Sequence, residues 1–232
     1  MADKVTAIVL AAGKGSRMNS DIPKQYLTLL GKPVLFYSLQ AFEDSKVDEI
    51  ILVTGSGEQE YCKKEIIEKY CFNKVVCIAE GGEQRYHSVW NGLCAVTDAD
   101  YVLIHDGARP LVSTKVINKA LDKVKENDAC VVGMPVKDTI QLVDDSGVIS
   151  STPERRNTWM AQTPQCFRYD LVFSSYKEAI TCGDNSITDD AMVVQRYGKA
   201  KVSMLEGGYE NIKVTTPEDI AVAECFLKMR EL

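Results

Sequence analysis

Short apolar runs rich in β-branched residues alternate with segments of helical periodicity over the first half of the chain. The apolar runs cover residues 5–10, 49–53, 74–78, 101–105 and 130–136. Between them, apolar residues recur every three or four positions in residues 34–42, 59–70, 88–95 and 114–125. Strands that alternate with helices pair in parallel through right-handed crossovers. We therefore expect an α/β fold with a doubly wound, mostly parallel Rossmann-like sheet.

The pattern changes after residue 136. Residues 139–143 and 148–151 flank the turn sequence Asp-Asp-Ser-Gly at 144–147, which indicates a projecting β-hairpin. A two-stranded hairpin is marginal in water on its own. We predict an arm at about residues 137–158 that packs against a second subunit; a hairpin lying on its own domain is the alternative that the pattern leaves open.

Periodic segments return beyond the hairpin. Helices are predicted at residues 169–180, 189–197 and 217–229, and a strand at residues 201–205. The chain has 232 residues, 45% of them apolar and 26% charged, which matches a globular protein with a sizeable core. We expect one domain over residues 1–232.

The formal net charge is −6, without a block of like charge. This argues against a nucleic-acid binder, which must neutralise many phosphates. No apolar run approaches the roughly 20 residues that span a bilayer, and the N-terminus lacks a secretory pattern. The eight cysteines include no C-x-x-C pair, so we interpret most of them as reduced core residues. We expect a cytoplasmic protein that binds neither nucleic acid nor membrane.

A run of small residues directly after the first predicted strand is the strongest signal for chemistry. Its members are Ala11, Ala12, Gly13 and Gly15. Ligands of open α/β sheets bind beyond the carboxyl ends of strands, and small residues let backbone N–H groups approach phosphate oxygens. Arg17 and Lys24 add positive charge. The run lacks the features of a P-loop and of the dinucleotide fingerprint. It predicts a triphosphate cradle, with a tight turn bearing solvated cations as the alternative.

Residues 105–110 form a second polar cluster, at the end of the strand predicted over 101–105. Asp106 is suited to orient a magnesium-bound phosphate or an acceptor hydroxyl, and Arg109 to hold an acceptor phosphate. We interpret His105 as a hydrogen-bonded structural group. A capped turn with an exposed arginine is the alternative.

Further segments are weaker on their own. Gly82 and its neighbours precede a predicted helix that contains Ser88, so their backbone can contact a base edge or a phosphate. Residues 152–156, 188–190 and 211–213 add cations and hydroxyls, each more typical of a solvated face or a helix cap when taken alone.

Taken together, these segments resemble the 2-C-methyl-D-erythritol 4-phosphate cytidylyltransferase family, which uses CTP in bacterial and plastid isoprenoid synthesis. The resemblance covers nearly the whole chain. Seven motifs carry it in order: Ala11-Ala12-Gly13-x-Gly15-x-Arg17-Met18, Pro23-Lys24-Gln25-Tyr26, Gly81-Gly82-x-x-Arg85, His105-Asp106-Gly107-Ala108-Arg109-Pro110, Trp159-x-Ala161-Gln162-Thr163-Pro164-Gln165, Thr188-Asp189-Asp190-Ala191 and Asn211-Ile212-Lys213-Val214-Thr215.

The resemblance implies a role for each motif. Arg17, Lys24 and the glycine loop would hold the CTP triphosphate. The segment that reads cytosine would run from residue 82 to 88 and include Gly82, Glu83 and Ser88. The acceptor would be surrounded by Asp106, Arg109, Arg155, Thr188 and Lys213.

The arm arginine has two candidates. The resemblance implies that Arg155 reaches the acceptor from the arm of a partner subunit in a homodimer. Counting back from Trp159 selects Arg155, with the adjacent Arg156 as the fallback.

The expected chemistry needs few bases. A phosphate monoester has a second pKa of about 6, so the acceptor is mostly dianionic at neutral pH and attacks the α-phosphorus of CTP without a general base. The burden is to bring two polyanions together and to stabilise the transition state. We expect Mg²⁺ as cofactor, and the resemblance implies four catalytic cations: Arg17, Lys24, Arg155 and Lys213.

The sequence is also compatible with other activities. A ribitol 5-phosphate cytidylyltransferase would use the same nucleotide with a different acceptor, and the stretch from Glu154 to Trp159 looks less like that enzyme. A sugar 1-phosphate nucleotidyltransferase is a more distant relative. A non-catalytic CTP-sensing module belongs to another class, and it would need no second anion pocket.

Overall fold

The computed structural model describes residues 3–13, 15, 18 and 22–230. Arg17, predicted to hold the triphosphate, lies outside the described residues. Within them, a seven-stranded sheet has the order β11-β7-β10-β6-β1-β4-β5. Its strands are β1 (Val5–Ala11), β4 (Glu49–Thr54), β5 (Val75–Glu80), β6 (Tyr101–Asp106), β7 (Ala129–Pro135), β10 (Trp159–Arg168) and β11 (Ser203–Glu206). All pairings are parallel except those of β10. The expected doubly wound, mostly parallel sheet is confirmed.

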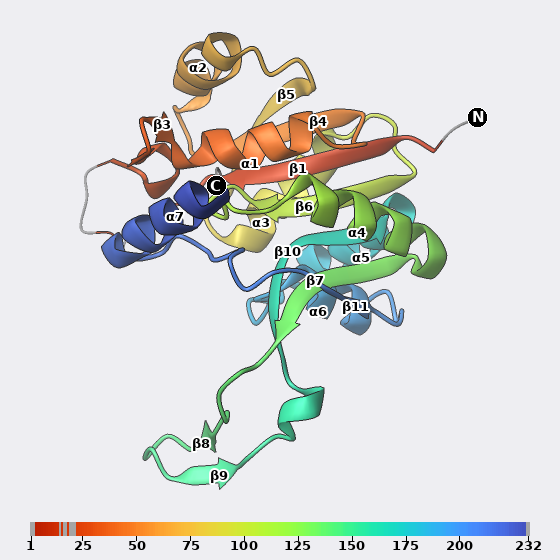
Figure 1. Ribbon diagram of the computed structural model, residues 1–232. Helices are drawn as coiled ribbons and strands as arrows, with labels where there is room; N and C mark the ends of the chain where they lie inside the picture. The colour runs from red at the N-terminus through yellow and green to blue at the C-terminus, as the bar shows by residue number, and fades with distance from the viewer. Residues whose placement is uncertain (1–2, 14, 16–17, 19–21, 231–232) are drawn as a thin grey trace.

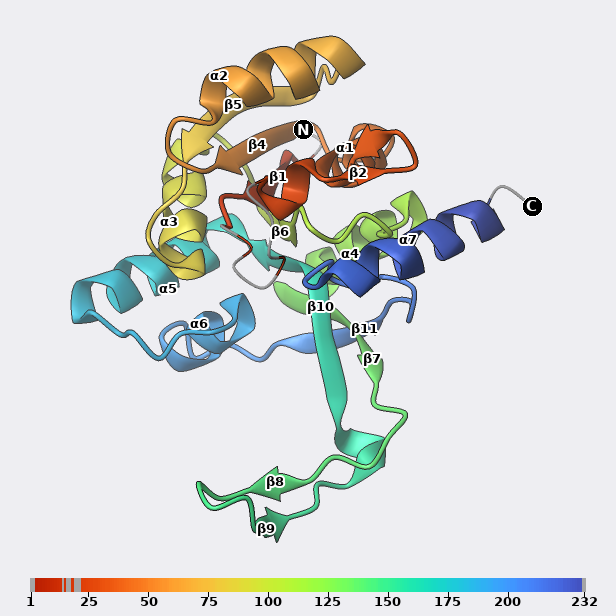
Figure 2. The same ribbon diagram turned by 90° about the vertical axis from the view of Figure 1, so that its left-hand side faces the viewer.

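Helices cover both faces of the sheet (Figures 1 and 2). One face carries α1 (Val34–Glu43), α4 (Thr114–Asn127) and α2 (Gln59–Tyr61), which continues as a π-helix (Cys62–Glu68). The other carries α3 (Arg85–Ala95), α5 (Tyr169–Cys182) and α6 (Asp190–Arg196). Along β1, Val9 packs into the core beneath α1 and α4, and its neighbour Ile8 packs into the core beneath α3 and α5. This alternation is expected for a strand that is buried on both faces.

The helix boundaries follow capping chemistry. The Ser113 hydroxyl caps the start of α4 by accepting from the Val116 N–H (3.3 Å). The Asp189 carboxylate caps α6 by accepting from Ala191 N–H (2.8 Å). Helix α3 begins at Arg85, three residues before the predicted start, which brings the Arg85 side chain onto the helix end that faces the sheet edge.

Strand β10 was not predicted. It runs antiparallel between β6 and β7 in the middle of the sheet, and its pairing with β7 shifts register between Ala161 and Gln165. Pro164 lies in this irregularity, where a residue without an N–H interrupts the ladder least.

A third, smaller core lies beside the main sheet. Helix α7 (Pro217–Arg230) packs with β2 (Thr28–Leu29), which pairs with β3 (Lys32–Pro33). Leu29, Val34 and Val214 are buried in this core. The packing holds the segment around residue 213 next to the loop after β1.

Residues 136–158 form an arm that extends away from the sheet (Figures 1 and 2). Its tip pairs β8 (Leu142–Val143) with β9 (Ile149–Ser151), and both strands are shorter than predicted. At its base, Val136 N–H donates to Thr158 O (3.0 Å). The arm exposes large apolar side chains: Ile140, Leu142, Val143, Val148 and Ile149.

Candidate active site

A cavity of about 590 Å³ opens at the carboxyl ends of β1 and β6, beside the N-terminus of α3. Polar groups and glycines from distant parts of the chain line it, as expected for a ligand site in an open α/β sheet. The lining includes these residues proposed from sequence: Ala11, Ala12, Gly13, Lys24, Gly82, Glu83, Ser88, Asp106 and Lys213.

The loop after β1 forms one wall of the cavity. Among the described residues, none apart from its chain neighbours lies within 4 Å of a Cβ built on Gly13. Gly15 has φ +63°, a conformation that favours glycine, and a Cβ at this position would come within 3.2 Å of Lys24 Cβ. Gln25 Nε2 donates to Ala11 O (2.6 Å) and Lys24 Nζ to Val214 O (3.1 Å). These bonds fix the loop and the lysine against the cavity.

The segment before α3 forms the opposite wall. A Cβ on Gly81 would lie 2.3 Å from Ala12 Cβ, so the Gly81 backbone packs directly against the Ala12 methyl group. Ser88 Oγ accepts from Gly82 N–H (3.1 Å). Ser88 therefore shapes this wall from within the helix.

Asp106 forms the floor and pairs with two cations. Its Oδ2 lies 2.7 Å from Lys213 Nζ and its Oδ1 3.0 Å from Arg85 Nε. Burial raises the pKa of the Asp106 carboxyl, but the charges of Arg85 and Lys213 outweigh it and hold that pKa well below its usual range. Asp106 is therefore ionised at neutral pH.

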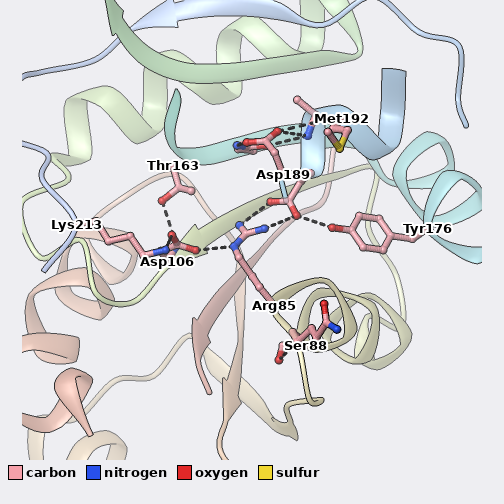
Figure 3. Close-up of polar contacts among 12 residues, drawn as sticks. Arg85, Ser88, Asp106, Thr163, Tyr176, Asp189, Met192 and Lys213 are labelled. Atoms are coloured by element: carbon pink, nitrogen blue, oxygen red, sulfur yellow. Dashed lines mark hydrogen bonds and ion pairs between the residues drawn. The ribbon is translucent and has the colours of Figure 1, made fainter. Parts of the chain in front are cut away.

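Arg85 joins this floor to α6. Its two terminal nitrogens donate to Asp190 Oδ1 and Oδ2, both at 2.7 Å, and Tyr176 Oη donates to Asp190 Oδ1 at 2.5 Å (Figure 3). Asp190 is completely buried. Arg85 belongs to the motif Gly81-Gly82-x-x-Arg85, which by itself predicts no partner for its side chain.

Strand β10 fixes the carboxyl end of β6 through Thr163. Thr163 Oγ1 accepts from Asp106 N–H (3.1 Å) and lies 3.0 Å from His105 Nδ1. His105 Nε2 faces Arg109 O (3.3 Å), a group that only accepts, so Nε2 carries the proton and Nδ1 accepts from Thr163. Burial lowers the pKa of His105 to about 3, which leaves the ring neutral. His105 is thus a structural group in this arrangement.

Three residues assigned to the acceptor do not line the cavity. Arg109 donates through a terminal nitrogen to Asn211 O (2.7 Å), and its buried Nε meets no acceptor among the described residues. Thr188 is exposed, two residues before Asp190. Arg155 is exposed on the arm, with a terminal nitrogen 3.3 Å from Lys137 O, and Arg156 next to it pairs with Glu154 (2.8 Å).

Within the described chain, no group of three or more His, Cys, Asp or Glu side chains is placed to hold a metal ion. The described helices also include none that is long and apolar enough to cross a membrane.

A glycine-walled cavity with a lysine on one side and a carboxylate–lysine pair on the other suits a nucleotidyltransferase, which must bring a nucleotide and a second anion together. A family model for 2-C-methyl-D-erythritol 4-phosphate cytidylyltransferase matches residues 5–229. The chain belongs to this family, and the sequence-based expectation of a CTP-using nucleotidyltransferase is confirmed.

Similar proteins agree over the whole length. A protein of Lachnoclostridium phytofermentans with the family's name is 49% identical over 226 residues, 97% of each chain. One from Lachnospira eligens is 50% identical, covering 96% of this chain and 99% of its own. The crystal structure of 4-diphosphocytidyl-2C-methyl-D-erythritol synthase from Anaerococcus prevotii superimposes with TM-score 0.85 and 32% identity, covering 97% of this chain and 96% of that one.

Proposed function

We propose that this chain transfers CMP from CTP to 2-C-methyl-D-erythritol 4-phosphate, with release of pyrophosphate, in non-mevalonate isoprenoid precursor biosynthesis. One observation carries the proposal: a single cavity has the glycine loop and Lys24 on one side and the Asp106–Lys213 pair on the other. The reaction requires two anion-binding regions that share one open space.

The nucleotide occupies the glycine-walled side. Backbone N–H groups at Ala12 and Gly13 approach the phosphates, and Lys24 stabilises the charge that builds on the α-phosphate and the leaving pyrophosphate. We assign the same role to Arg17 on the ground of its motif. The wall formed by Gly82, Glu83 and Ser88 faces the base.

The acceptor occupies the side of Asp106 and Lys213. Lys213 Nζ holds the acceptor phosphate while one phosphate oxygen attacks the α-phosphorus, and the bond to pyrophosphate breaks with its electron pair leaving on pyrophosphate. The Asp106 carboxylate accepts a hydrogen bond from a hydroxyl of the polyol. We assign Arg109 and Thr188 to the acceptor on the ground of their motifs, although neither lines the cavity.

Mg²⁺ is the proposed cofactor. The ion prefers oxygen ligands and is commonly held by one or two carboxylates together with substrate phosphates. Asp106 is the carboxylate on the cavity floor, but Lys213 and Arg85 already engage both of its oxygens, so the substrate phosphates would supply most of the ion's ligands. When bound, the ion would neutralise part of the triphosphate charge.

We further propose a cytoplasmic homodimer formed through the arms. The arm exposes several large apolar side chains, and an isolated hairpin gains little stability from its own contacts. Pairing of two arms would cover these side chains and carry Arg155 of one subunit to the acceptor side of the other. All eight cysteines are free thiols, which suits a reducing compartment.

The direct test is acceptor-dependent pyrophosphate release. The enzyme is assayed with CTP and Mg²⁺ plus 2-C-methyl-D-erythritol 4-phosphate, ribitol 5-phosphate or no acceptor. We expect turnover with the first acceptor alone. Turnover only with ribitol 5-phosphate would replace the acceptor assignment. CTP binding without turnover under any of the three conditions would indicate a sensor instead of an enzyme.

A further inference from the structure

Arg85 stands in the segment expected to read the base, yet its side chain turns to two carboxylates on the acceptor side. We infer that Arg85 is a positioning residue for acceptor binding: it holds the Asp106 carboxylate and keeps the Lys213 ammonium available for the acceptor phosphate. This inference rests on the proposed function and adds a residue that acts through Asp106 and Lys213.

The geometry assigns each guanidinium nitrogen to a carboxylate. Arg85 Nε lies 3.0 Å from Asp106 Oδ1, and the two terminal nitrogens grip Asp190 at 2.7 Å each. The Asp106 and Asp190 side chains are 10% and 0% exposed, against 29% for Arg85. Figure 3 shows Arg85 between Asp106 on one side and Tyr176 on the other. The Tyr176 hydroxyl donates to the same Asp190 carboxylate that Arg85 contacts. A buried charge held by a two-pronged contact has little freedom to rotate.

The balance of charges around Asp106 explains why Lys213 stays available for the acceptor phosphate. Two carboxylates, Asp106 and Asp190, face two cations, Arg85 and Lys213. Because Arg85 neutralises part of the Asp106 charge, the ammonium of Lys213 keeps a positive field toward the cavity. Without Arg85, Lys213 would be the remaining described cation within ion-pair distance of Asp106, and the acceptor phosphate would have to compete with that carboxylate for it.

Arginine is required by shape as well as by charge. The planar guanidinium contacts Asp190 with two nitrogens while a third faces Asp106, whereas a lysine ammonium is a point charge that cannot reproduce this fork. Asp190 begins α6, two residues after Thr188. Arg85 therefore also ties the floor of the cavity to the segment that carries a proposed acceptor residue.

A double-mutant cycle tests whether Arg85 acts through Asp106. Steady-state constants for both substrates are measured for wild type, Arg85→Gln, Asp106→Asn and the double variant, with circular dichroism and Tm as folding checks. We expect each single variant to lose about 10²-fold in kcat/KM for the acceptor, with the CTP KM within about twofold of wild type. The double variant should lose no more than about threefold beyond Asp106→Asn.

Arg196→Gln is the matched control, because Arg196, at the end of α6, pairs with Asp184 in the preceding loop and does not line the cavity. It should keep wild-type kcat/KM. The cycle is repeated with Arg85→Lys, which retains the charge, so that the test stands even if Arg85→Gln does not fold. We expect Arg85→Lys to raise the acceptor KM by about tenfold.

Two results would overturn the inference in an active enzyme: losses that multiply in the double variant, or a rise confined to the CTP KM. Either would make Arg85 a structural or a nucleotide-binding residue. A wild-type enzyme that releases no pyrophosphate with any acceptor would instead remove the proposed function, and this inference with it.

Discussion

The glycines on the two walls of the cavity have opposite steric surroundings. A Cβ on Gly13 would meet no atom of the described part of the chain within 4 Å, whereas a Cβ on Gly81 would lie 2.3 Å from Ala12 Cβ. We expect Gly13→Ala to keep the wild-type Tm and to raise the CTP KM, because the new methyl group occupies space needed by a phosphate.

Gly81→Ala should lower the free energy of unfolding by about 1–3 kcal/mol through overpacking. Denaturant titration and steady-state kinetics check both; equal CTP KM values for Gly13→Ala and wild type would contradict the first.

Lys24 carries the nucleotide side of the reaction on our proposal. Lys24→Ala should reduce kcat by about 10²- to 10³-fold in a folded protein, since a preorganised cation opposite the leaving group is lost. Lys115→Ala, on the exposed part of α4, is the matched control and should retain wild-type turnover. A folded Lys24→Ala enzyme with near wild-type kcat would remove Lys24 from the mechanism.

His105 makes stability depend on pH. Its folded pKa is lowered to about 3, while an unfolded histidine titrates near 6.5. Between these values the unfolded chain binds a proton that the folded chain excludes. The contribution of His105 to the free energy of unfolding is therefore fully present above pH ~6.5. It is lost as the pH falls, by up to about 1.4 kcal/mol per pH unit.

His105→Gln should flatten this slope between about pH 4.5 and 7, a window in which Asp106 stays ionised in both states. Urea titrations of the variant, of wild type and of His87→Gln supply the comparison, since His87 is the other histidine of the chain. Equal slopes in all three proteins would show that His105 does not control the acid sensitivity.

Among the elements, hydrophobic periodicity predicted the alternating strands and helices of the parallel sheet but missed the antiparallel strand β10. Its centre is polar, with Gln162, Thr163 and Gln165 all buried. Each has a tertiary partner: Gln162 Nε2 donates to Gly208 O (2.9 Å), Gln165 Nε2 to Asp189 Oδ2 (2.6 Å), and Thr163 contacts His105. A strand whose interior organises a functional site gives no alternating apolar signal.

The site was predictable where a motif is local and unpredictable where it depends on distant partners. The glycine loop, Lys24, Asp106 and Lys213 come together in the cavity from motifs that the sequence displays. The contact between Arg85 and Asp190 joins residues 105 positions apart, which no spacing rule reveals.

The arm supplies a prediction at the same scale. Val143 and Ile149 are cross-strand partners that are 55% and 59% exposed. Replacing both by threonine keeps β-branched shapes and removes apolar contact area. We expect sedimentation equilibrium to show a weaker dimer, with lower activity at low protein concentration. Val76→Thr, 56% exposed on the edge strand β5, is the control and should leave the mass unchanged. An unaltered dimer in the double variant would exclude the arm as the interface.

At the scale of the whole molecule, the proposal divides one active site between two subunits. Arg155→Ala impairs the arm and Lys24→Ala impairs the cavity, so each protein alone should be nearly inactive. After subunit exchange, half of the dimers would contain one of each chain and one intact site, which restores about a quarter of wild-type activity. Pyrophosphate release from the mixture measures this directly. Activity that stays at the sum of the two single variants would place Arg155 in its own subunit's site or outside the reaction.

The two ends of the arm leave the sheet from β7 and β10, which are hydrogen-bonded neighbours. Residues inserted or removed between Pro135 and Trp159 therefore leave the paired strands, and the cavity behind them, in place. Tyr209 Oη donates to Pro135 O (2.9 Å) and fastens this junction to the loop that leads to Lys213. Over evolutionary time, the arm can change in length and in the sequence of its tip, away from Arg155, while the strands that carry the cavity are inherited unchanged.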